Sequence, residues 1–138
     1  MKSEKLIGMI YWGALTISIL IIFNNFGLYL YITGFLILGA LLFHIIVGTR
    51  INQLVNNKFL LTLSSINLML FSLVRIDGVH ATSGSGLSEF LQLLDLNIYY
   101  KGNDSVHLLL TLVTYIIQLS IDGFLYKKSK VTAQELSN

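Results

Sequence analysis

Cysteine and proline are both absent from this chain of 138 residues. The lack of cysteine excludes disulfides, thiol redox chemistry and thiolate metal sites, and with them the four-pass membrane families that depend on extracellular disulfides. The lack of proline removes a common cause of kinks in membrane helices that surround a transported ligand. Membrane helices in this chain are therefore expected to be fairly straight.

Charged residues are also scarce, at 12% of the chain, and the net charge is only +2. This balance leaves no basic surface for nucleic acid. Hydrophobic residues make up 54% and gather in four runs, each close to the ~20 residues that cross a bilayer as a helix. The runs predict membrane spans at about residues 6–23, 27–47, 59–76 and 106–126. Little chain remains for a soluble domain, so residues 1–138 are interpreted as one domain.

The lysines and arginines indicate how this domain is oriented. All but two lie before the first run, between the second and third, or after the fourth: Lys2, Lys5, Arg50, Lys58, Lys127, Lys128 and Lys130. Only Arg75 and Lys101 lie on the other side, so the positive-inside rule places both termini in the cytoplasm. The sequence thus predicts an all-α, integral membrane four-helix bundle. Its richness in Ile, Asn, Lys and Tyr is typical of an AT-rich bacterial gene and favours a bacterial inner membrane.

The one long connection, residues 77–105, falls on the predicted outer side. Within it, four apolar residues recur at helical spacing: Leu87, Phe90, Leu91 and Leu94. This spacing predicts a short amphipathic helix over residues 87–96. Because such a helix is too short to span a bilayer, we expect it to lie on the outer membrane surface or over the mouth of the bundle.

Two amide side chains fall inside the spans, where polar groups are costly. Asn67 lies eight residues into the third span from its cytoplasmic end, and Gln118 lies about as far from the cytoplasmic end of the fourth. At about 1.5 Å per residue the two share a depth, so they are expected to form a hydrogen bond. We interpret the pair as helix-packing glue worth roughly 1 kcal/mol. The alternative is a polar rim on a pore.

His44 and Asp122 form a second polar level nearer the cytoplasmic face. Both lie about one to one-and-a-half turns inside their spans. Being so close to the interface, they are interpreted as two side chains that reach the headgroups separately. The functional alternative is a proton-sensitive switch or a proton path, because histidine titrates near neutrality.

A third polar group gathers near the outer ends of the third and fourth spans: Arg75, Asp77, His80 and His107. Its expected role is to anchor the outer loop and pair charges. A metal site from His80, His107 and a carboxylate was considered, but the spacing matches no known ligand motif. The sequence therefore predicts neither a metal nor another cofactor.

No catalytic motif is present, and the serines near His80 lack the nucleophile-elbow pattern. The leading hypothesis is a non-enzymatic membrane sensor or adaptor that homo-oligomerises and couples an outer or membrane signal to a cytosolic protein partner. Bacterial phage defence or toxin immunity is the suggested setting. A small oligomeric ion or proton channel is the alternative, and a membrane enzyme is third. In the channel alternative, the residues that would form the ion or proton pathway are Asn67, Gln118, His44 and Asp122.

Overall fold

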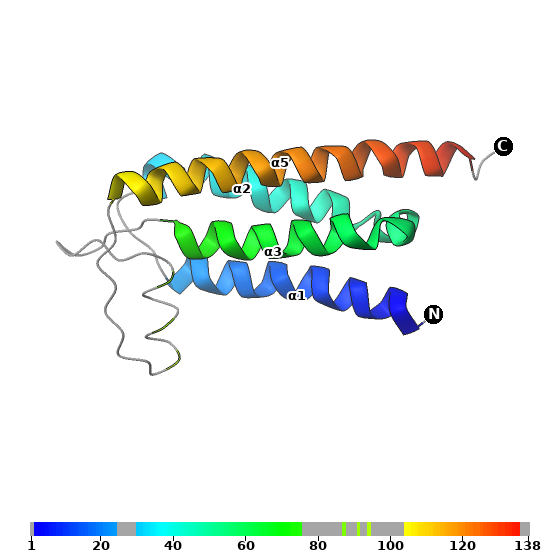
Figure 1. Cartoon of the computed structure of the whole chain (residues 1–138), viewed down its shortest axis with the longest axis horizontal. Coiled ribbons are helices and arrows are strands. Elements are labelled where there is room, and N and C mark those ends of the chain that lie inside the picture. Colours follow the sequence, from blue (N-terminus) through cyan, green and yellow to red (C-terminus); the bar gives the residue numbers. More distant parts are fainter. Residues whose placement is uncertain are drawn as a thin grey trace.

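The chain folds into helices. The computed structural model describes residues 2–24, 30–75 and 104–135, together with the single residues 87, 91 and 94. Four α-helices and one short 3-10 helix account for nearly all of these residues, and none of them is in a strand. The elements are α1, Lys2–Asn24; α2, Leu30–Gly48; η1, Ile51–Asn57; α3, Lys58–Val74; and α5, Asp104–Glu135 (Figure 1). The all-α prediction is confirmed for this part of the chain.

The α-helices lie side by side (Figure 1). α1 and α3 run in the same direction and pack closely on each other, whereas α5 runs the opposite way and packs on both α3 and α2. The start of α1, the 3-10 helix and the last turns of α5 lie together at one end of the bundle, called the η1 end below. The C-terminal ends of α1 and α3 lie at the opposite end, called the far end.

Three helices are long and apolar enough to cross a membrane, with candidate spans Glu4–Phe23, Ile51–Val74 and Ser105–Glu135. The apolar segment of α2, Thr33–Gly48, is shorter. Large apolar side chains face outward: Met9, Phe35 and Leu109 are 72%, 68% and 62% exposed. Many of the buried side chains are instead polar. This reversal of the water-soluble pattern is consistent with a membrane protein, because lipid solvates apolar groups and polar groups must find partners inside.

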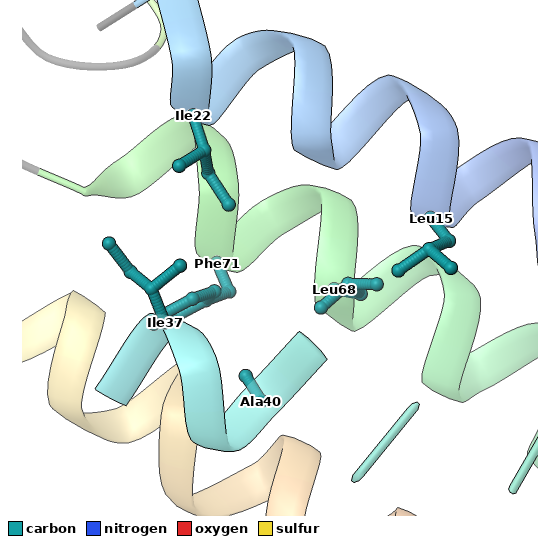
Figure 2. Packing of buried hydrophobic residues seen from close by; sticks show 6 residues of the cluster. All are labelled: Leu15, Ile22, Ile37, Ala40, Leu68 and Phe71. Carbon is teal, nitrogen blue, oxygen red and sulfur yellow. The ribbon is translucent and has the colours of Figure 1, made fainter. Parts of the chain in front are cut away.

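Two apolar clusters fill the bundle at different levels. The first lies toward the far end, where side chains from α1, α2 and α3 converge (Figure 2): Leu15, Ile22, Ile37, Ala40, Leu68 and Phe71. The second lies toward the η1 end and consists of Tyr11, Val47, Leu54, Leu61 and Leu125. Between the two levels lie the polar side chains described in the next subsection.

Helix bounds differ from the predicted spans in two places. α5 extends to Glu135, nine residues beyond the predicted end, because no glycine or proline follows Tyr126 to stop it. Its 32 residues measure about 48 Å, longer than a hydrocarbon core of ~30 Å. The polar turn between the second and third spans is the 3-10 helix η1, anchored by the fully buried Leu54.

The short outer helix predicted over residues 87–96 lies mostly outside the described residues. Leu87 and Leu91 are helical, and the backbone N–H of Leu94 donates to Leu91 O at 3.2 Å. Phe90 is not among the described residues. The amphipathic helix and its place at the membrane surface stay predictions.

Candidate functional site

Six polar side chains meet at the level between the two apolar clusters, and all four α-helices contribute; one of the six, Tyr11, also belongs to the apolar cluster toward the η1 end. Tyr11 comes from α1, His44 from α2, Ser64 and Asn67 from α3, and Gln118 and Asp122 from α5. We call this set the polar cluster. Asn67 is 5% exposed and the other five are 0% exposed. Burying polar groups without hydrogen bonds costs several kcal/mol, so their contacts decide whether the bundle is stable.

Helical spacing brings these residues to one place. On α5, the polar residues His107, Thr111, Thr114, Gln118 and Asp122 follow one another at intervals of three or four residues, so they form one stripe along the helix. On α3, Ser64 and Asn67 are three residues apart and share a face. Because α3 and α5 run in opposite directions, Asn67 meets Gln118 and Ser64 meets Asp122.

Ser64 is at the centre of the cluster. Its hydroxyl Oγ donates to Asp122 Oδ1 at 2.6 Å. Gln118 Nε2 lies 2.9 Å from both Ser64 Oγ and Asp122 Oδ2, so it donates to each. Both carboxylate oxygens of Asp122 therefore receive a hydrogen bond, which compensates in part for the loss of water around a buried charge.

His44 completes the cluster from α2. Its Nδ1 lies 3.1 Å from Ser64 Oγ and 3.6 Å from Asp122 Oδ2, and its Nε2 lies 3.5 Å from the carbonyl oxygen of Tyr11. The expectation that His44 and Asp122 reach the headgroups separately is wrong, because both are fully buried and face each other. Asp122 lies in the interior of α5, well before its end at Glu135. His44 faces inward through its contacts with Ser64 and with the Tyr11 carbonyl.

Tyr11 covers one face of the imidazole of His44. The two rings are stacked, with centroids 3.8 Å apart and planes 5° from parallel. The Tyr11 hydroxyl donates to His44 O at 3.0 Å, which fixes the phenol ring along α2. Trp12 packs edge-on to Tyr11, with ring centroids 6.3 Å apart.

Gly48 makes room for both rings. A Cβ atom at this position would lie 2.8 Å from Trp12 Cζ2 and 3.1 Å from Tyr11 Cε1. Real Cβ atoms do not approach other atoms so closely, so the absence of a side chain at Gly48 is what lets α1 pack against α2 here.

Asn67 and Gln118 extend the cluster toward the far end. Asn67 Nδ2 donates to Thr114 O at 2.8 Å and to Gln118 Oε1 at 2.9 Å, which uses both of its amide hydrogens. Gln118 Nε2 also lies 3.3 Å from His44 Nδ1. The two polar levels of the sequence analysis are therefore one connected cluster, joined through Gln118 and Ser64.

The geometry allows one proton to be held in two places. In the first arrangement His44 Nδ1–H donates to Ser64 Oγ, and the Ser64 hydroxyl donates to an ionised Asp122. In the second, a protonated Asp122 donates to Ser64, and the Ser64 hydroxyl donates to His44 Nδ1. Both arrangements keep the cluster neutral overall, and Nε2–H faces the Tyr11 carbonyl in each. Both placements of the proton are compatible with the distances around Ser64.

The contact of a serine, a histidine and an aspartate does not make a catalytic triad. In a triad the histidine uses one ring nitrogen for the serine and the other for the carboxylate. Here Ser64 and Asp122 both approach Nδ1 of His44, so the ring cannot pass a proton from one to the other across its two nitrogens. All three side chains are also fully buried.

A cavity of about 370 Å³ lies at the η1 end, between the start of α1 and η1. Its lining consists of Glu4, Lys5, Ile7, Gly8, Ile51, Asn52, Val55 and Leu61. Ile7 precedes Tyr11 by one helical turn, and Leu61 precedes Ser64 by slightly less than one. The cavity therefore approaches the polar cluster from the η1 end along both α1 and α3.

At the far end, two of the four residues of the predicted outer cluster bind helix ends. Arg75 is fully buried, and its Nη2 donates to Ile22 O at 3.3 Å, near the end of α1. His107 Nδ1 lies 3.0 Å from Val74 O, the last residue of α3. Carbonyls in the last turn of a helix have no helical partner, and cations are favourable there.

The other two residues of the outer cluster, Asp77 and His80, lie outside the described residues. In the part of the chain that the structure describes, no group of three or more His, Asp and Glu side chains is placed to hold a metal ion. A role for Asp77 and His80 in anchoring the loop stays a prediction.

Sequence reasoning missed Ser64 and Tyr11. A signal for Ser64 existed, because it lies three residues before Asn67 on the same face of α3. The contact of Tyr11 with His44 depends on how α1 and α2 are rotated, which no local pattern reveals. Comparison of the chain with protein-family models, with curated proteins and with solved structures finds no match, so the site is interpreted from its own geometry.

Proposed function

We propose that the chain is a four-pass membrane protein, with both termini in the cytoplasm, that acts as a proton-responsive sensor or adaptor. The observation that carries this proposal is the fully buried His44–Asp122 pair, which contacts residues from all four α-helices. Ionisable groups inside a membrane are costly and usually mark a functional site.

Protonation of this pair would change the interactions that hold all four α-helices together. The neutral cluster gains a net charge if the His44–Asp122 pair takes up a second proton or loses the one it shares. An uncompensated buried charge costs several kcal/mol, so the helices must rearrange or admit water to relieve it. The cavity at the η1 end lies about one turn from Tyr11 and Ser64. The buried apolar side chains of Leu54 and Leu61 lie on the same side, so protons from that end would have to pass them.

The η1 end is the proposed output surface. It carries the start of α1, the 3-10 helix η1 and the last turns of α5, which is about 48 Å long and projects beyond the other helices (Figure 1). In the proposed orientation these elements face the cytosol, where a protein partner would bind them. Self-association is kept as a prediction, because lipid covers the exposed apolar surface of the bundle as well as a second copy would.

The absence of cysteine gives a direct test of the orientation. Single-cysteine variants Lys5→Cys and Glu135→Cys introduce the only thiol of each protein. We expect a membrane-impermeant maleimide to label both only after cells are permeabilised. A Leu87→Cys variant, on the predicted outer side, should be labelled in intact cells. Labelling of Glu135→Cys in intact cells would overturn the proposed topology and, with it, the cytosolic adaptor.

A proton path is the second candidate, and one observation favours it. The stripe of polar residues on α5 runs from His107 to Asp122, about 22 Å along the helix. Against a continuous path, Thr111 Oγ1 donates to His107 O and Thr114 Oγ1 donates to Leu110 O, so both hydroxyls bond to their own helix.

Proteoliposomes with a trapped pH dye separate the two candidates. The sensor account predicts no more proton flux than protein-free vesicles under an imposed potential. Flux that disappears in Asp122→Asn would favour the path. A role in phage defence or toxin immunity stays a prediction, for which the genes beside this one are the evidence to seek.

A further inference from the structure

Two cations lie over the same aromatic ring at the η1 end. The guanidinium carbon of Arg50 is 5.0 Å from the centroid of the Tyr126 ring, and Lys130 Nζ is 4.8 Å from it. The two charges are therefore at most ~10 Å apart, about one Debye length at 0.1 M salt, and they repel each other. The ring attracts both cations through its quadrupole but does not neutralise them.

No carboxylate in the described part of the chain forms an ion pair with Arg50 or Lys130. The donors of both side chains therefore keep their capacity for hydrogen bonds to an anion. A guanidinium presents its donors in a planar fork that matches a phosphate, and a lysine adds a compact charge beside it.

The lysines of α5 turn back toward the apolar part of the bundle. Lys128 lies over Phe124 at 5.5 Å and Lys130 over Tyr126, so each lysine folds onto the ring four residues before it. Side chains on a helix tilt toward its N-terminus, which here points them away from the projecting end of α5. Phe124 is 50% exposed and belongs to the apolar surface, so the ammonium group of Lys128 lies at the edge of that surface.

We propose that Arg50, Tyr126 and Lys130 form a binding site for the phosphate of an anionic phospholipid. The ring of Tyr126 contacts both cations, and Phe43 packs against that ring with centroids 6.2 Å apart. The lipid's acyl chains would lie along the exposed apolar surface of α2 beside Phe43, where Ile46 is 42% exposed. The assignment of this lipid to the cytoplasmic leaflet rests on the proposed topology. The preference for an anionic headgroup does not depend on that topology.

Native mass spectrometry of the detergent-solubilised protein tests this site with two lipids of identical acyl chains, phosphatidylglycerol and phosphatidylcholine. We expect phosphatidylglycerol to be retained preferentially. Arg50→Gln and Lys130→Gln should each weaken its binding about fivefold, the effect of one basic residue near an anionic surface. Equal retention of the two lipids by the unmodified protein would overturn the proposal.

Lys127→Gln is the matched control, because it removes the same charge from an exposed residue of the same helix that has no ring contact. It should weaken binding less than about twofold. Equal losses in all three variants would show only a diffuse surface charge and would overturn the site. Tyr126→Phe, which keeps the ring, should bind as the unmodified protein does, whereas Tyr126→Leu should not.

The readout in detergent does not depend on membrane orientation. Preferential binding of phosphatidylglycerol together with external labelling of Glu135→Cys would support the lipid site and reject the proposed topology. Equal retention of the two lipids, together with labelling of Glu135→Cys only after permeabilisation, would reject the lipid site and leave the proposed topology standing.

Discussion

The ring of Tyr11 lies flat on the imidazole of His44, with centroids 3.8 Å apart and an interplanar angle of 5°. The contact couples α1 to the one histidine that faces the buried carboxylate of Asp122. Through the same histidine, α2 is coupled to α3 and α5 by way of Ser64 and Gln118. A change in the charge of His44 therefore acts on a stacked ring as well as on hydrogen bonds.

Gly48→Ala should disturb this stack. The added methyl group would meet Trp12 Cζ2 at 2.8 Å and Tyr11 Cε1 at 3.1 Å, so one ring must move. We expect a loss of about 1–3 kcal/mol in the free energy of unfolding, as for other overpacked cores. The measurement is unfolding in mixed micelles. Gly34→Ala is the control, since nothing lies within 4 Å of its Cβ position, and an equal loss in both variants would contradict the account.

Asp122→Asn and His44→Gln should each be strongly destabilising, by about 3–5 kcal/mol, because each leaves one charge or polar group of a buried pair without its partner. The double variant removes the charges together, and we expect it to recover part of the loss. A double-mutant cycle on unfolding in mixed micelles gives this coupling. Strict additivity would show that the two residues do not act as a pair.

Asn67→Leu and Gln118→Leu should differ in cost, although the sequence treats them as equivalent partners. Asn67 donates to Gln118 and to the Thr114 carbonyl, so its loss should cost roughly 0.6–2 kcal/mol. Gln118 also donates to Asp122 Oδ2, and its loss leaves that buried oxygen without this donor, so the cost should be greater. Equal unfolding free energies for the two variants would indicate that Asn67 and Gln118 only hold α3 and α5 together by their mutual hydrogen bond.

The sequence was sufficient to predict an all-α chain with apolar helices, because composition and run length determine both. It also indicated that Asn67 and Gln118 lie at the same depth, because the rise per residue is the same in both helices. In the structure Asn67 Nδ2 lies 2.9 Å from Gln118 Oε1. The burial of His44 and Asp122 was misjudged because their depth was measured from the ends of the apolar runs. α5 continues past that point to Glu135.

The neighbours of each helix could not be predicted. α1 packs mainly on α3, and its Tyr11 reaches His44 of α2 only because Gly48 leaves space. Such contacts depend on how each helix is rotated about its axis. A helix that is apolar on most sides carries no sequence pattern that specifies this rotation. Arg75 donates to the Ile22 carbonyl of α1, a backbone partner that side-chain patterns do not show.

The central claim is that the polar cluster changes conformation when its charge changes, and Trp12 is placed to report it. It is the only tryptophan of the chain and packs on Gly48 beside Tyr11. The titratable groups that face one another here are Tyr11 of α1, His44 of α2 and Asp122 of α5, whereas Ser64 and Asn67 of α3 do not titrate.

The measurement is Trp12 fluorescence of the protein in nanodiscs as a function of pH. At lower pH a second proton on the pair leaves a net positive charge, and at higher pH the loss of the shared proton leaves a net negative one. We predict that the emission of the unmodified protein changes with pH, and that the His44→Gln, Asp122→Asn double variant gives a flat profile. An identical pH profile in the double variant, or a flat profile in the unmodified protein, would contradict the account.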